Sequence, residues 1–132
     1  MKLYSEIIEE LELCNTKEDA LLIVRRYQNP RLVMFLKYAL NEKIIFDTPI
    51  PTYNPSTNPI GLTFTTLNME TPKLYLHIKD DKARNNMSVE RRQTSLLVLL
   101  ESLHKDEAAL LVDVMTKKFS MKNLTYEMIK DL

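Results

Sequence analysis

The sequence has little of what most enzymes and disulfide-stabilised proteins depend on. Its 132 residues include one cysteine, one glycine, two histidines and no tryptophan. One cysteine excludes an internal disulfide and a cysteine-rich zinc site, and one glycine excludes a glycine-rich phosphate-binding loop. The histidines, His77 and His104, belong to no HExxH pair and to no Cys/His cluster. We therefore expect no cofactor and no metal ion, name no catalytic residue, and predict that the protein is not an enzyme.

The chain also lacks an excess of charge and a long hydrophobic run. Its 18 Lys and Arg residues balance its 18 Asp and Glu residues, so the formal net charge is +0. This balance argues against a strongly basic coat for nucleic acid. No unbroken apolar run exceeds the five residues of Leu96–Leu100, whereas a membrane-spanning helix needs about 20. The first residues turn acidic at Glu6 without the apolar core of a secretory signal, so we expect a soluble intracellular protein with no membrane partner.

What remains is the composition of an ordinary globular domain. Hydrophobic residues make up 45% and charged residues 27% of the chain, which excludes an intrinsically disordered protein. A chain of this length is typical of one domain. We predict that residues 1–132 fold as a single compact domain.

Three amphipathic helices are predicted in the first third of the chain. Between Leu3 and Cys14, apolar residues recur at three- and four-residue steps, and glutamates fill most of the intervening positions, the pattern of a helix with an acidic outer face. Thr16 precedes a second apolar helical pattern and is the type of residue that caps a helix. Asn29 followed by Pro30 predicts the start of a third helix, because Asn is a preferred cap and Pro is favoured at the first helical position.

The composition changes at Asp47. Residues 47–61 have the sequence DTPIPTYNPSTNPIG, with four prolines, which neither a helix nor a central strand tolerates. The sequence therefore predicts a proline-rich extended loop over about residues 47–61. Two roles remain open for it. It is either a strap over the helical core, anchored by Ile50, Tyr53 and Ile60, or the contact for a partner protein, through Pro49, Pro51, Tyr53 and Pro55.

The second half of the chain is predicted to be helical as well. Residues 62–67 form a short strand or an extended lead-in. Thr71 followed by Pro72 is a second cap-plus-proline signal, so residues 73–78 are expected to form a short helix or, alternatively, a strand. Ser88 is expected to cap the longest apolar helix, with leucines on a broad face, which we predict to be central to the core. Asp106 is expected to cap the next helix, and Thr125 a last short one. The fold class that follows is all-α, with six or seven short helices.

Basic residues gather late in the sequence. Residues 79–92 hold five basic and three acidic side chains, and residues 117–122 hold three lysines and no acid. If the two stretches pack side by side, their cations form one face that can contact DNA phosphates. The alternative is that they are ordinary surface charges near helix ends. The nucleic-acid contacts that this pattern predicts are Arg84, Arg91, Arg92, Lys117, Lys118 and Lys122.

Two resemblances bear on function. The opening stretch SEIIEELELCNTKEDALLIVRRYQNPRLVMFLKYALN, the proline loop and the closing stretch SLLVLLESLHKDEAALLVDVMTKKFSMKNLTYEMIKDL resemble a small protein family of T-even-like tailed phages and cyanophages. The layout is also similar to the N-terminal helical DNA-binding domain of phage ATP-dependent DNA ligases. The matching positions are the helix start at Thr16 and Lys17 and the late residues Leu111, Asp113, Lys118 and Ile129. The KxDG lysine of the ligase nucleotidyltransferase domain is absent, which excludes ligation.

Two functions follow as hypotheses. The first, which the ligase resemblance favours, is a non-catalytic phage accessory protein that binds the DNA backbone through a late basic face, in the cytoplasm of the infected bacterium. The alternative is a protein-binding adaptor or inhibitor, which acts on a host or phage machine through the proline-rich loop or the acidic first helix.

Overall fold

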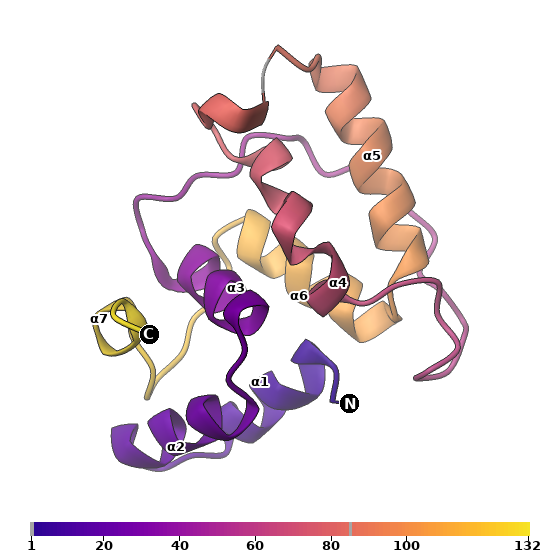
Figure 1. Cartoon of the computed structure of the whole chain (residues 1–132). Coiled ribbons are helices and arrows are strands. Elements are labelled where there is room, and N and C mark those ends of the chain that lie inside the picture. Colours follow the sequence, from indigo (N-terminus) through magenta and orange to yellow (C-terminus); the bar gives the residue numbers. More distant parts are fainter. Residues whose placement is uncertain (1, 85) are drawn as a thin grey trace.

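The computed structural model describes residues 2–84 and 86–132 (Figure 1). These residues contain seven α-helices and two short 3-10 helices, joined by loops. Their bounds are α1 Tyr4–Glu12, α2 Lys17–Tyr27, α3 Pro30–Leu40, α4 Leu67–Glu70, η1 Thr71–His77, η2 Lys82–Arg84, α5 Val89–Ser102, α6 Lys105–Met115 and α7 Tyr126–Ile129. No strand occurs within these residues, although Phe46 and Ile78 form an isolated antiparallel bridge. The prediction of an all-α domain of six or seven helices is confirmed.

The second and third helices begin where their caps predict. The Thr16 hydroxyl accepts a hydrogen bond from the backbone N–H of Asp19 at 3.1 Å. The Asn29 side chain accepts from the backbone N–H groups of Arg31 and Leu32, both at 3.0 Å. These bonds satisfy N–H groups that have no partner inside the helix, so the local sequence is sufficient to place both helix starts.

The middle of the chain is helical, but its start differs from the prediction. Helix α4 begins at Leu67, capped by the Thr66 side chain, and continues directly into η1. Thr71 does not cap a helix, because its hydroxyl donates to the carbonyl oxygen of Leu67 at 2.7 Å. The residues before Thr66 form an extended lead-in rather than a strand.

The connection between α5 and α6 also differs from the prediction. Ser88 caps α5 as expected, accepting from the Arg91 N–H at 3.2 Å. The cap of α6, however, is His104 and not Asp106: the His104 Nδ1 atom accepts from the Asp106 N–H at 3.1 Å. An imidazole nitrogen without a proton can accept a hydrogen bond from a backbone N–H. Histidine is nevertheless not among the residue types that usually identify a helix cap in a sequence.

Helices α3 and α6 occupy the centre of the molecule. Helix α6 packs against α1, α3 and α5, and α3 also packs against η1 and α7; Figure 1 shows α5 on one side of this pair and the α1–α2 hairpin at the other end. Helix α5 was predicted to be central, and this is wrong. Only Leu96 and Leu100 of its apolar run are fully buried, whereas Val98 is 60% exposed, because α6 and the proline-rich loop leave the Val98 side of α5 uncovered.

A buried carboxylate joins three helices in this core. Glu107 of α6 is fully buried, and its two oxygens accept the backbone N–H groups of Tyr4 at 2.9 Å and Leu67 at 3.0 Å. Tyr4 and Leu67 are the first residues of α1 and α4, where the helix dipole favours a negative charge. Burial nevertheless raises the pKa of Glu107 above its ordinary value. One side chain therefore fixes where two helices start.

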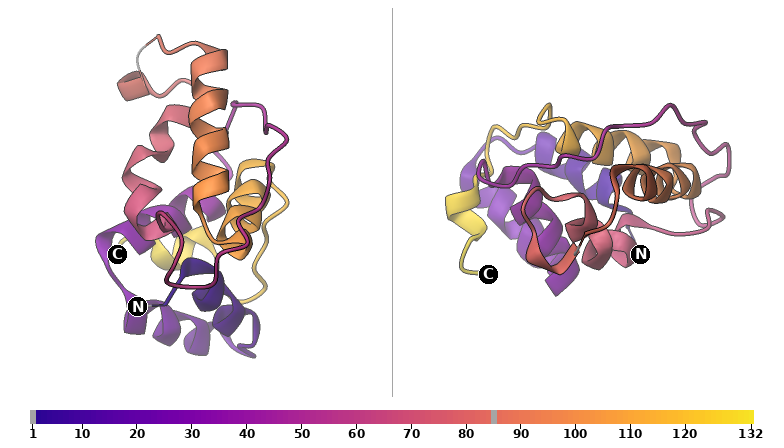
Figure 2. Two further views of the ribbon diagram at one scale, coloured as in Figure 1. Left: turned by 90° about the vertical axis from the view of Figure 1, so that its right-hand side faces the viewer. Right: turned by 90° about the horizontal axis from the view of Figure 1, so that it is seen from above.

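The proline-rich segment is an extended loop, as predicted, and its first half follows α5 (Figure 2). The Gln93 side-chain amide donates to the carbonyl oxygen of Pro49 at 3.2 Å, and the backbone N–H of Asn54 donates to Glu101 at 2.8 Å. Ile50 and Tyr53 pack against the core. Ile60 was expected to be a third anchor, but it is 52% exposed, so the strap ends before the loop does.

None of the helices in the described part of the chain combines the length and the hydropathy that crossing a bilayer requires.

Candidate interaction surface

Two of the six predicted phosphate contacts are engaged inside the molecule. The Arg84 guanidinium binds both carboxylate oxygens of Asp47, at 2.6 and 2.9 Å. The Arg92 Nη1 atom binds the same carboxylate at 2.7 Å and the Thr48 hydroxyl at 3.1 Å, and its side chain is only 6% exposed. Arg84 first, and then Arg92, hold the pKa of Asp47 below its usual range. These two guanidinium groups fasten the start of the proline-rich loop to η2 and to α5.

His77 extends this polar cluster toward the core. Its Nδ1 atom lies 2.9 Å from the Thr48 hydroxyl, and the residue is almost completely buried. Burial, reinforced by the positive charges of Arg92 and Arg84, lowers the pKa of His77 to about 4. The imidazole is therefore neutral at neutral pH, which avoids a third buried cation beside one carboxylate.

The other four predicted contacts do not converge on one face. Arg91 is exposed at the start of α5, whereas the three lysines, Lys117, Lys118 and Lys122, lie on the segment after α6. Figures 1 and 2 show this segment running from α6 toward α7, away from the start of α5. Lys117 donates to the carbonyl oxygen of Asn41 at 3.4 Å, and burial lowers its pKa. The structure thus separates the two basic stretches.

The predicted partner contacts of the proline loop divide into two kinds. Pro51 and Tyr53 are half-buried, and Tyr53 packs against the core; burial raises the pKa of its hydroxyl. Pro49 and Pro55 are exposed. The first half of the loop is therefore laid against the helices, with two prolines left at the surface.

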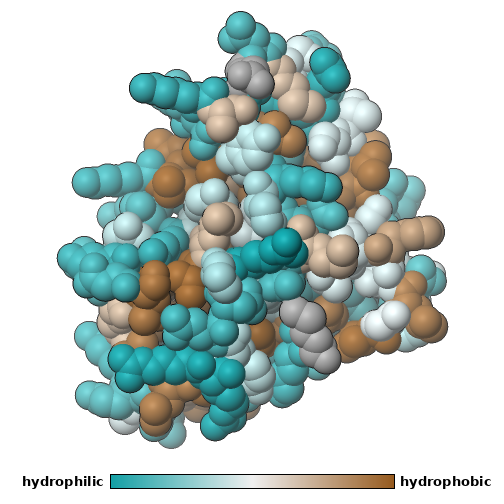
Figure 3. Space-filling view, viewed as in Figure 1, coloured by the Kyte–Doolittle hydropathy of each residue, from teal (hydrophilic) through white to brown (hydrophobic). Residues whose placement is uncertain are grey.

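The end of the proline-rich loop, the residues that follow it, and the neighbouring helices α4 and α5 carry apolar side chains whose exposure the sequence did not predict. Phe64 is 89% exposed, and the other apolar side chains of this region are more than half exposed; the set, called the Phe64 surface below, consists of Ile60, Leu62, Phe64, Met69 and Val98. Figure 3 shows hydrophobic residues along the right-hand edge of the molecule, over α5 and the loop before α4. Gly61 has φ +88°, a left-handed conformation that favours glycine, and it turns the chain between Ile60 and Leu62.

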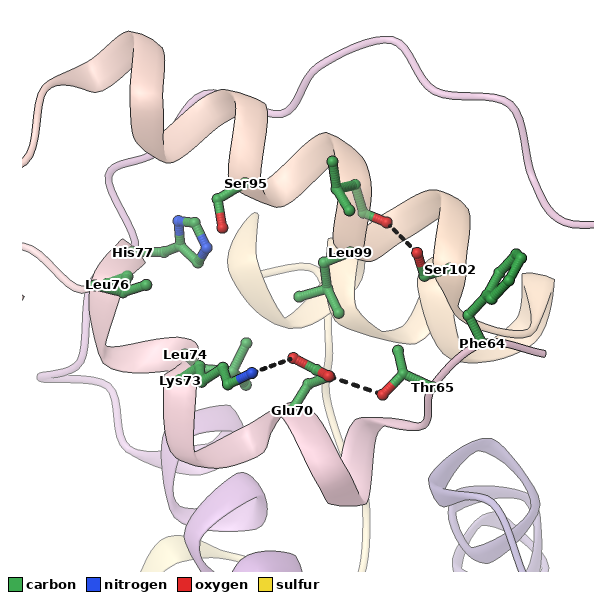
Figure 4. Close-up of a pocket in the computed structure, with 11 residues that line it drawn as sticks. Phe64, Thr65, Glu70, Lys73, Leu74, Leu76, His77, Ser95, Leu99 and Ser102 are labelled. Atoms are coloured by element: carbon green, nitrogen blue, oxygen red, sulfur yellow. Dashed lines mark hydrogen bonds and ion pairs between the residues drawn. The ribbon is translucent and has the colours of Figure 1, made fainter.

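Two hollows adjoin this surface, and Phe64 borders both. The first, of about 480 Å³, lies between α5 and the α4–η1 segment; Leu74 and Leu99 are among the residues that line it (Figure 4). The second, of about 310 Å³, lies between the loop and the starts of α1 and α4, and Glu107 is among its lining residues. Both match the general form of a binding site, with apolar walls and a few polar groups.

Several polar groups of the first hollow already have partners within the molecule. Glu70 accepts the Thr65 hydroxyl at 2.8 Å and lies 3.8 Å from the Lys73 ammonium, as the dashed lines in Figure 4 show. The His77 Nδ1 atom is engaged by Thr48. The charged groups of this hollow are thus paired within the molecule, and apolar side chains such as Leu74 and Leu99 form the rest of its wall.

One signal in the sequence does point to this surface. The unbroken apolar run of α5, Leu96–Leu100, covers every side of the helix, and a helix that is apolar all round needs partners on all sides. The sequence cannot say whether those partners belong to the same chain.

The search of the curated proteins found no match to this chain, nor did the search of the solved structures. A family of unknown function, DUF6433, matches residues 7–121. The matched region begins in α1 and ends in the segment after α6. It therefore contains α5, the proline-rich loop and all five residues of the Phe64 surface. The chain belongs to the family DUF6433.

Proposed function

We propose that this protein is a non-catalytic protein-interaction module that docks another chain on the Phe64 surface. The observation that carries the proposal is the 89% exposure of Phe64 between two apolar hollows. The five side chains are 52–89% exposed, and at about 150–250 Å² for a large side chain they offer on the order of 600 Å² of apolar surface. The largest apolar patch on a typical monomer is itself about 300–600 Å² and is often a functional site.

The half-covered state of α5 supports the same proposal. Val98 is 60% exposed in the middle of an apolar run, and α5 is backed by α6 on the opposite side. Transferring the exposed apolar side chains out of water is favourable by about 25 cal/mol per Å². A partner that covers α5 together with Phe64 gains this term without any rearrangement of the core.

Binding of nucleic acid through a late basic face stays a prediction, as does the phage origin that the resemblances imply. The internal pairing of Arg84 and Arg92 removes two of its six contacts. Arg91 lies apart from the lysines of residues 117–122, which argues against one continuous basic face. These observations support the protein-binding alternative over DNA binding, and we propose that its contact lies after the anchored half of the proline-rich loop.

A photocrosslinking amino acid at position 64 tests the proposed function directly. We expect benzoylphenylalanine in place of Phe64, in cells that make the protein, to capture a discrete protein chain. The matched control is the same amino acid in place of Leu13, which is 80% exposed at the end of α1. Equal capture at both positions, or none at position 64, contradicts the proposal.

A parallel titration with duplex DNA over a salt series tests the alternative. A steep fall of affinity with salt, lost in the variant Lys118→Glu with Lys122→Glu, would favour phosphate contacts over protein docking.

A further inference from the structure

Two polar groups meet at one end of the hollow between α5 and the α4–η1 segment. Ser95 of α5 and His77, the last residue of η1, both line this hollow. Figure 4 shows the Ser95 hydroxyl and the His77 imidazole facing each other at one end, with Phe64 at the opposite end. Within the described residues, neither the Ser95 hydroxyl nor the His77 Nε2 atom has a hydrogen-bond partner, and neither is fully buried. Both groups are therefore available to a ligand in the hollow.

The hydrogen bonds behind His77 determine which ring nitrogen carries its proton. The Arg92 Nη1 atom donates to the Thr48 hydroxyl oxygen at 3.1 Å, because a guanidinium has no acceptor. The hydroxyl hydrogen of Thr48 then meets the His77 Nδ1 atom, 2.9 Å from the oxygen, and is donated to it. The neutral ring consequently carries its proton on Nε2, where the N–H group is a donor toward the hollow.

These groups give the hollow one hydrogen-bonding end and an apolar wall. The imidazole N–H and the serine hydroxyl are donors at that end, and the Arg92 guanidinium, one hydroxyl group behind the imidazole, favours negative charge there. Leu74 and Leu99 are among the apolar side chains of the wall. The carboxylate in the wall, Glu70, accepts the Thr65 hydroxyl at 2.8 Å, on the Phe64 side of the hollow (Figure 4). A ligand with an anionic head and an apolar body matches this polarity in one orientation.

We infer that this hollow binds a small apolar carboxylate. Its head group accepts hydrogen bonds from His77 Nε2–H and from the Ser95 hydroxyl, and its hydrocarbon body lies along Leu99 toward Phe64. The inference goes beyond the proposed function, because the ligand is a small molecule and the residues that hold its head group are not part of the Phe64 surface.

The dimensions of the hollow fit such a ligand. Its volume of about 480 Å³ lies within the range of about 300–1,000 Å³ that is usual for small-molecule sites, which are mostly apolar with a few placed polar groups. Ser95 and Ser102, which both line it, are separated by about 10 Å along the helix axis. An extended octanoate is of similar length, so we choose octanoate as the probe.

Isothermal titration calorimetry with octanoate tests the inference. We expect saturable binding of one octanoate per chain. Octylamine is the matched control ligand, because it has the same hydrocarbon chain but a cationic head that cannot accept a hydrogen bond at neutral pH. We expect octylamine to bind at least about tenfold more weakly, since its head faces two donors and the charge of Arg92.

Two serine variants on α5 test the head-group contact. Ser95→Ala removes one donor to the carboxylate and is expected to weaken octanoate binding by at least about fivefold. Ser102→Ala is the matched control, because Ser102 also lines the hollow but its hydroxyl donates to the carbonyl oxygen of Val98 at 2.6 Å. We expect its affinity for octanoate to equal that of the wild type. Circular dichroism verifies that both variants are folded.

Nuclear magnetic resonance tests the role of His77. The chain has two histidines, so a protein labelled with ¹⁵N-histidine gives two sets of imidazole signals, which the variant His104→Asn assigns. We expect the proton of the neutral His77 ring on Nε2, and we expect this nitrogen to shift when octanoate is added. The signals of His104, which does not line the hollow, are expected to stay in place.

The inference is supported by octanoate binding that Ser95→Ala weakens and Ser102→Ala does not, together with the shift at His77 Nε2. It is overturned if octanoate at millimolar concentration does not bind, if octylamine binds equally well, if Ser95→Ala leaves the affinity unchanged, or if the ring proton is on Nδ1. None of these results bears on the proposed function, which the photocrosslinker at position 64 tests independently.

Discussion

Removing the Glu107 carboxylate is expected to loosen the starts of α1 and α4 together. Each of its two oxygens accepts one backbone N–H, from Tyr4 at 2.9 Å and from Leu67 at 3.0 Å. A hydrogen bond to a charged group contributes about 1.5–3 kcal/mol, and a buried N–H left without a partner costs about 1–3 kcal/mol. The cost of burying the carboxylate, which raises its pKa, offsets part of this gain.

These contributions predict different losses of stability for two substitutions of Glu107. Glu107→Ala leaves both N–H groups unpaired and is expected to lower the free energy of unfolding by about 3–4 kcal/mol. Glu107→Gln keeps one accepting oxygen but turns an NH₂ group toward the second N–H, so we expect a loss of about 2 kcal/mol. Since small domains are stable by about 5–15 kcal/mol, both losses are measurable by urea unfolding followed by far-ultraviolet circular dichroism.

The pH dependence provides a second measurement on the same residue. Because the folded-state pKa of Glu107 is raised, the folded protein binds this proton more tightly than the unfolded chain does. The corresponding stability is present below the ordinary value of 4.5 and is lost as the pH rises through the folded pKa. We expect the stability of the wild type relative to Glu107→Gln to decrease over that interval.

The control for Glu107 is an exposed glutamate. Glu127 pairs with Lys130 at 2.6 Å, but its side chain is 73% exposed, and exposed pairs contribute about 0–1 kcal/mol. Glu127→Gln should therefore unfold at nearly the same urea concentration as the wild type. The reasoning is refuted if Glu107→Ala also unfolds there, since the carboxylate would then not hold the two helix starts.

Two further predictions concern the polar cluster at the start of the proline loop. Asp47→Asn is expected to cost about 3–5 kcal/mol in urea unfolding, because it leaves the Arg92 charge buried without a counterion; adding Arg92→Leu should recover part of the loss, and no recovery would mean that the charge is not the cause. The pKa of folded-state His77 is about 4, below its ordinary value of 6.5. As the pH falls, the unfolded chain therefore takes up this proton before the folded protein does. We expect the His77 contribution to the free energy of unfolding to be complete above pH 6.5 and to fall by about 3 kcal/mol as the pH drops to 4. The variant His77→Asn should lack this part of the pH dependence, and an unchanged pH profile would exclude His77 as its source.

The fold class and most helix starts follow from local features of the sequence. Thr16, Asn29 and Ser88 cap their helices as predicted, because a cap joins a side chain to backbone groups within three residues. The prolines of residues 47–61 likewise exclude regular structure wherever the loop lies, since the ring fixes φ and removes a hydrogen-bond donor. Interactions of such short range depend on the local sequence and not on the tertiary structure.

The tertiary structure alone decided which charges and which apolar side chains remain at the surface. Arg84 and Arg92 resemble surface cations in the sequence, yet their partner Asp47 lies 37 and 45 residues away. Glu107 binds an N–H group 103 residues distant. Periodicity shows that Val98 and Phe64 are apolar, but how much of each is covered depends on which elements pack against it. Burial is a property of the assembled helices, and for this reason the Phe64 surface could not be predicted from the sequence.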